Sequence, residues 1–96
     1  MVLRQVLATL LLSIQRHDLE ANYGARNDTI YQALAMARLL DYSAGIRLDP
    51  EEPEWPVIYI ELPTGQVSWH VAQHEHPWDT HTTADKYGRI ADWLRG

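Results

Sequence analysis

The chain has 96 residues, 46% of them hydrophobic, and a formal net charge of −5 with neutral histidines. This length predicts one domain over residues 1–96, and the acidic balance argues against general nucleic-acid binding, which needs clustered basic side chains. The absence of cysteine excludes disulfides and thiolate metal sites.

The N-terminal segment carries apolar residues at helical spacing. They are Leu3, Val6, Leu7, Leu10, Leu11 and Ile14. This spacing predicts a buried helix from about Val2 to near Glu20, with Gly24 as its stop. The apolar run is too short to span a bilayer, and no small-residue cleavage site of a signal peptide follows it.

A second helix is expected after a cap at Asn27 or Asp28, because a short side-chain oxygen satisfies free amides of the first turn. Its apolar face would consist of Ile30, Ala33, Leu34 and Ala37. The helix should end at Tyr42-Ser43, so the first two helices predict a helical hairpin.

The periodicity then changes to that of strands. Ala44, Ile46 and Leu48 alternate with other residues, which predicts a first strand. The three prolines of residues 49–56 predict an extended loop without regular pairing. Residues 57–62 form the clearest strand, and residues 66–71 its partner.

Two registers are open for this hairpin. A three-residue loop, Pro63-Thr64-Gly65, with the glycine in the left-handed conformation pairs Tyr59 with Trp69. His70 would then share a face with the inner isoleucines. A tighter loop pairs Ile58 with Trp69 and gives a cleaner apolar face. We favour the three-residue loop on its turn chemistry.

The last element is a helix that begins after Thr82-Thr83, a sequence typical of a capping box. Its apolar stripe consists of Tyr87, Ile90, Ala91 and Leu94. The predicted fold is therefore α+β in the order ααβββα, with the helices against one face of a three-stranded antiparallel sheet.

Four of the five histidines and two of the four tryptophans lie within residues 69–83. Aromatic rings can stack on a base, and free amides at the start of a helix can hold a phosphate. We therefore predict a site for a nucleotide-type ligand. Its candidate residues are Trp69, Trp78, Asp79, His81, Thr82, Thr83 and Lys86. The alternative is structural, with Trp78 anchoring the loop and Thr82 capping the helix.

The sequence predicts no cofactor. The alternative is a divalent metal bound by histidines. His74 and His76 point the same way in an extended segment, and His70 can add a nitrogen ligand. Their spacing matches no familiar metal motif. His81 beside Asp79 offers an oriented imidazole, but no nucleophile has a supporting context. We therefore expect no enzymatic activity, with a metal-dependent hydrolase using residues 70–81 as the alternative.

A third candidate is a protein interface in the acidic loop. Glu51, Glu52 and Glu54 surround Trp55, which could anchor a basic partner surface. The alternative is a solvated loop with the tryptophan folded onto the sheet edge.

The run from Trp78 to Ile90 resembles a signature of small phage- and prophage-encoded proteins of unknown role. The signature reads roughly Trp-Asp-Gly-His-Thr-Thr-Glu-Glu-Lys-Tyr, and residues 62–70 resemble the hairpin of the same family. This chain departs from it at Thr80, Ala84 and Gly88. Thr80 matters most, because glycine permits backbone shapes that threonine resists.

The resemblance implies a phage setting and the cytoplasm of a bacterial host. There, small acidic proteins counter host defences by sequestering a nucleotide signal or masking a defence protein. We expect such a non-enzymatic counter-defence binding protein. No membrane association is expected, and the small size favours a homo-oligomer.

Overall fold

The computed structural model describes residues 2–71 and 83–96, apart from the side chains of residues 52–55 and 83–85. Its elements are α1 (Val2–Leu19), α2 (Tyr23–Leu39), β1 (Ala44–Asp49), β2 (Glu52–Leu62), β3 (Gly65–His70) and α3 (Thr83–Arg95). The sheet is antiparallel in the order β1-β2-β3. The predicted α+β fold in the order ααβββα is confirmed.

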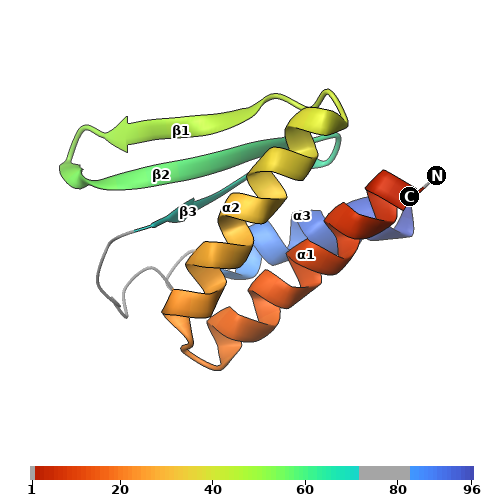
Figure 1. Ribbon diagram of the computed structural model, residues 1–96, viewed down its shortest axis with the longest axis horizontal. Helices are drawn as coiled ribbons and strands as arrows, with labels where there is room; N and C mark the ends of the chain where they lie inside the picture. The colour runs from red at the N-terminus through yellow and green to blue at the C-terminus, as the bar shows by residue number, and fades with distance from the viewer. Residues whose placement is uncertain (1, 72–82) are drawn as a thin grey trace.

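The helices lie on one face of the sheet, here called the inner face (Figure 1). Helix α2 contacts β1 and β2, and α3 contacts β3 and β2. Helix α1 packs on α2 and α3. The opposite, outer face has no described helix against it (Figure 1).

Helix α1 buries one face only. Leu7, Leu11 and Ile14 are fully buried, whereas Val6 is 38% exposed, so the prediction of a buried helix is correct for one side. Within the described residues, no helix is long and apolar enough to cross a membrane.

The predicted boundary between the first two helices is wrong. The stop is Ala21, which adopts a left-handed φ of 55°, while the Asn22 amide donates to the His17 carbonyl at 2.9 Å. Asn22 then caps α2 by accepting from the Ala25 amide. An alanine and an asparagine therefore make the turn that we assigned to Gly24, which lies inside α2. The predicted apolar face of α2, from Ile30 to Ala37, is buried.

The predicted loop over residues 49–56 is also partly wrong, because β2 begins at Glu52 and Asp49 pairs with Glu52. The ladder then skips to Leu48 opposite Pro56, which leaves residues 53–55 as a bulge. Pro56 lies at the end of the β2–β3 ladder. Its carbonyl accepts from the Val71 amide at 2.8 Å. Because proline has no N–H, the return bond to Val71 is missing, and the ladder loses only this one bond at its end.

The favoured hairpin register is wrong, and the tighter alternative is correct. Ile58 pairs with Trp69, and Leu62 pairs with Gly65, so the loop is the two residues Pro63-Thr64. This register places Ile58, Ile60, Val67 and Trp69 together on the buried face. A shift by one residue would expose half of them, and this burial outweighs the turn chemistry.

Two consequences follow from this register. His70 pairs with Val57 and lies on the outer face, so the prediction that it shares a face with the inner isoleucines is wrong. Gly65 has a φ of 132°, and a Cβ there would lie 2.9 Å from Arg89 Cδ. Glycine therefore lets α3 pack closely on the hairpin turn, where Thr64 Oγ1 donates to the Arg89 carbonyl at 2.6 Å.

Helix α3 contributes Tyr87, Ile90 and Trp93 to the core. The first two belong to the predicted stripe, and Trp93 was not predicted. The Trp93 indole donates to the Tyr42 hydroxyl at 3.2 Å, and its carbonyl accepts from Arg4 Nη2 at 2.7 Å. These contacts bring the two ends of the chain together, as Figure 1 shows.

Candidate functional site

A buried polar network joins all three helices to β3. Trp69 Nε1 donates to the Tyr87 hydroxyl at 3.3 Å, and that hydroxyl donates to Asp18 Oδ2 at 2.9 Å. Arg26 Nη1 donates to Asp18 Oδ1 at 3.2 Å. Arg26 Nη2 also donates to the His70 carbonyl at 2.8 Å. One continuous set of hydrogen bonds therefore fixes α1, α2, α3 and the end of β3 to one another.

The network is almost dry, since the Arg26 and Asp18 side chains are 3% and 1% exposed. Charges can be buried this deeply only when they are paired and hydrogen-bonded. The Arg26 guanidinium meets this condition, because it also donates to Asn27 Oδ1 from Nε at 3.1 Å.

Tyr87 supplies the neutral donor of the network. Burial raises the pKa of its phenol far above the ordinary value, and the hydrogen bond from Trp69 opposes that rise. The hydroxyl therefore stays protonated at any physiological pH and donates to the Asp18 carboxylate.

Lys86 is a second buried basic residue, after Arg26. The residue is 3% exposed, and its Nζ lies 5.3 Å from the centroid of the Trp69 ring. This is cation–π geometry. A lysine is thus held inside the protein beside Trp69, whose indole donates to the Tyr87 hydroxyl of the network.

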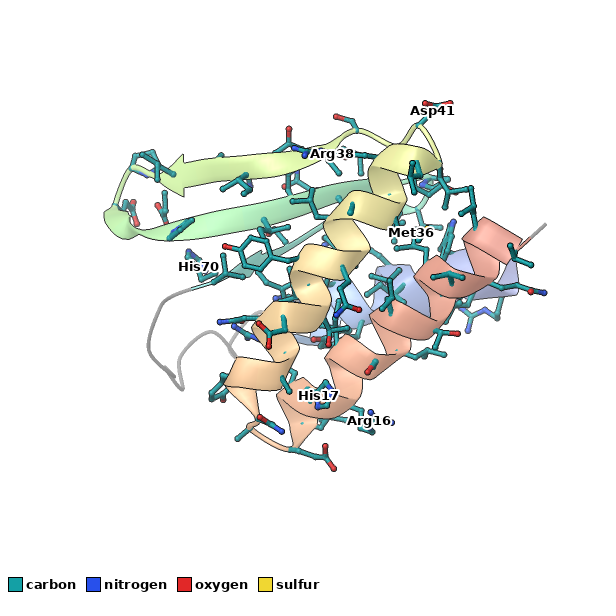
Figure 2. The ribbon with its side chains drawn as sticks, in the orientation of Figure 1. Arg16, His17, Met36, Arg38, Asp41 and His70 are labelled. Carbon is teal, nitrogen blue, oxygen red and sulfur yellow. The ribbon has the colours of Figure 1, made fainter. Side chains whose placement is uncertain are left out.

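The outer face of the sheet carries a second polar arrangement. His70 Nε2 lies 2.9 Å from Asp49 Oδ2, with side chains 31% and 26% exposed. The two residues border a hollow of about 370 Å³ that Arg47, Leu48, Pro50, Val57 and Ser68 also line. Figure 2 shows His70 at the end of β3, beside α2. The pair bridges β1 and β3 across β2.

The structure brings together two of the predicted ligand-binding residues, Trp69 and Lys86. The Trp69 ring is 1% exposed and belongs to the core. Thr83 is the first residue of α3. The other predicted ligand residues lie outside the described part of the chain; they are Trp78, Asp79, His81 and Thr82.

Of the predicted metal ligands, only His70 lies within the described residues, and its Nε2 contacts Asp49. His74 and His76 lie outside them. Among the residues that the structure describes, no three His, Asp or Glu side chains are grouped as a metal site.

The predicted interface residues lie at one end of the sheet. Glu51 is exposed in the turn between β1 and β2, where its amide donates to Asp49 Oδ1 at 3.0 Å. Glu52, Glu54 and Trp55 lie on the first part of β2. The backbone therefore places Glu51 in the turn, and Glu52, Glu54 and Trp55 in the bulged first part of β2.

Asp18 and Arg26 were not among the predicted site residues, although the sequence carries a signal for both. Asp18 continues the buried α1 series of Leu7, Leu11 and Ile14 at helical spacing. Arg26 lies on the buried face of α2, one turn before Ile30. A charged residue on an apolar helical stripe has to be paired when it is buried. This rule predicts that Asp18 and Arg26 each have a buried partner.

Comparisons with known proteins give one family. The WDGH domain family matches residues 11–93, which include, in whole or in part, each of the helices and strands that the structure describes. No curated protein and no solved structure matches the chain. The matched range contains the Trp78-Asp79-Thr80-His81 run together with the buried network from Asp18 to Tyr87. The chain belongs to the WDGH domain family.

Proposed function

We propose that this WDGH protein is a non-enzymatic binding protein that holds a small anionic ligand of nucleotide type at its signature segment, residues 78–83. One observation carries the proposal: the chain on both sides of this segment is tied into the buried network. On the N-terminal side, Arg26 donates to the His70 carbonyl. On the C-terminal side, Tyr87 donates to Asp18.

Such anchoring favours a binding role over a purely structural one for the signature. Binding sites commonly lie on loops whose ends a rigid scaffold positions. An aromatic residue, a histidine and two threonines of the segment would then be presented from a fixed frame. They are Trp78, His81, Thr82 and Thr83.

The charges near the frame favour an anion. Among the buried residues that the structure describes, Arg26 and Lys86 are basic and Asp18 is acidic, in a protein whose net charge is −5. The first turn of α3, which begins at Thr83, adds free amides and a partial positive charge.

The resemblance to phage proteins extends the proposal to a counter-defence role, in which the protein sequesters a nucleotide signal of a bacterial host. The second mode, in which Glu51, Glu52, Glu54 and Trp55 mask a host protein, rests on their position at the free end of the β1–β2 hairpin (Figure 1). The metal-dependent hydrolase is the weaker candidate, since His70 Nε2 already contacts Asp49.

A thermal-shift screen against mononucleotides, dinucleotides and cyclic nucleotides tests the proposal. We expect one class to raise the melting temperature, because a ligand that binds only the folded state stabilises it by mass action. Heating the complex should release the nucleotide chemically intact, as chromatography of the supernatant would detect. A chemically altered nucleotide would instead support the hydrolase.

Two matched sets of variants separate the binding modes. Trp78→Ala with His81→Ala should abolish the nucleotide-dependent shift. Reversal of Glu51, Glu52 and Glu54 to lysine should leave that shift unchanged. If the charge reversals alone abolish the biological activity, the protein-masking mode replaces the nucleotide mode.

A further inference from the structure

Strand β1 is an edge strand whose outer backbone groups point away from the sheet. The Glu61 amide donates to the Ser43 carbonyl at 2.8 Å. Hydrogen-bonded pairs alternate along an antiparallel ladder. The backbone groups of Gly45 and Arg47 therefore point toward β2, and those of Ala44, Ile46 and Leu48 point outward.

Little of the described structure covers this edge. Among the described strands, only β2 pairs with β1. Arg38 Nε donates to the Ala44 carbonyl at 3.1 Å, at the end of β1 nearest α2 (Figure 2). A carbonyl oxygen can accept a second bond, so Arg38 leaves the edge able to pair.

The same edge exposes apolar side chains. Ile46 is 52% exposed and Leu48 is 65% exposed. In the ladder they lie opposite Ile58 and Pro56, on the face that the rest of the sheet buries against helices. Natural edge strands are usually protected by charge, proline or a covering segment. Among the described residues, this apolar edge with outward backbone groups is therefore able to pair with another strand.

We propose that β1 pairs antiparallel with β1 of a second copy of this chain, about a two-fold axis at Ile46. Ile46 of each copy then exchanges both backbone hydrogen bonds with its counterpart. Ala44 lies opposite Leu48, and Gly45 lies opposite Arg47. The two three-stranded sheets become one continuous sheet.

The sequence of β1 favours its own copy as the partner. Its first half is small, with Ala44 and Gly45, and its second half is large, with Arg47 and Leu48. An antiparallel pair about Ile46 sets each small residue opposite a large one, which suits cross-strand packing. The paired stretch, residues 44–48, contains no carboxylate, so two chains of net charge −5 can approach along it.

The side chains at the axis provide the test, because residue 46 faces itself. Ile46→Lys alone and Ile46→Glu alone should each raise the dimer dissociation constant at least about tenfold, since like charges directly opposite oppose pairing and the Ile46 contact is lost. An equimolar mixture of the two variants should restore a dimer. Sedimentation velocity measures all three, with circular dichroism as the check on folding.

Leu12→Lys is the matched control, because Leu12 is 50% exposed on α1, far from this edge in the fold. It should sediment as the wild type does. If Ile46→Lys does not fold, Leu48→Glu tests the same edge, because it places a carboxylate opposite Ala44 of the second copy and removes the apolar Leu48 contact, so it should also weaken the dimer. A monomeric wild type, a dimer that survives both edge substitutions, or a dimer that only Leu12→Lys breaks would each overturn the proposal.

Discussion

Two carboxylate contacts, one with an arginine among the helices and one with a histidine on the outer face of the sheet, differ in what they can do. Arg26 and Asp18 lie 3.2 Å apart with side chains 3% and 1% exposed. His70 and Asp49 lie 2.9 Å apart, but their side chains are 31% and 26% exposed. The shorter contact is the better hydrated one. Water screens exposed charges and solvates each partner when the contact breaks, so burial outweighs distance in deciding the energy.

The difference also separates their roles. The buried pair belongs to a network that reaches three helices and β3. The exposed pair joins β1 to β3 only. Substitutions in the two arrangements should therefore give effects of different size.

The largest effect is expected from Arg26→Met. Asp18 then loses its ion-pair partner and the His70 carbonyl loses a donor, so we expect a loss of about 3–5 kcal/mol in the free energy of unfolding. Urea denaturation measures it. The double variant Asp18→Leu with Arg26→Met should cost less than the sum of the two single changes. A cost below about 1 kcal/mol for Arg26→Met would remove the distinction between the two pairs.

A smaller effect is expected from Tyr87→Phe, which takes one donor from Asp18 and leaves the ring in place. The expected cost is about 1–3 kcal/mol at neutral pH. Because the folded-state pKa of Tyr87 is raised, its contribution is complete below the ordinary tyrosine pKa of about 10 and is lost as the pH rises above it. The gap in stability between wild type and Tyr87→Phe should therefore narrow above that pH. A gap that is constant across the alkaline range would contradict this account.

The smallest effect is expected from His70→Ala on the outer face. A partly hydrated contact between a carboxylate and a histidine contributes about 0–1 kcal/mol, and the His70 backbone carbonyl still accepts from Arg26 in the variant. Asp49→Asn should be similarly mild. A cost of several kcal/mol from either change would mean that the outer pair supports the fold as strongly as the buried one.

Helices and strands with a clear hydrophobic periodicity were predictable from the sequence. Where two sequence features favoured different structures, the sequence did not show which of them would dominate. The stripe of α2 and the alternation of β2 gave the correct fold class. The hairpin register depended on whether the turn chemistry of Gly65 or the burial of Trp69 dominates, and burial did. The start of α2 followed Asn22 rather than the downstream Asn27, since a left-handed Ala21 ended α1 earlier.

Trp69 and Lys86 were both predicted as ligand residues. The structure places the Lys86 ammonium beside the buried Trp69 ring, and ligand binding by either residue stays a prediction. Their link to Asp18 and Arg26 spans residues far apart in the chain, so no local pattern shows it. The sequence indicates only that Asp18 and Arg26, as charged residues on otherwise apolar helical faces, each need a partner.

The central claim is that the buried network holds the signature segment ready to bind, and the outer pair does not. The most direct test measures the dissociation constant by isothermal titration calorimetry, with the nucleotide that gives the largest thermal shift. The titration is done at a temperature at which the wild type and every variant are folded. We predict that His70→Ala binds as the wild type does, and that folded Tyr87→Phe binds about tenfold more weakly, a change of about 1.4 kcal/mol. Equal affinities for Tyr87→Phe and wild type, or no binding of any nucleotide to the wild type, would contradict the account.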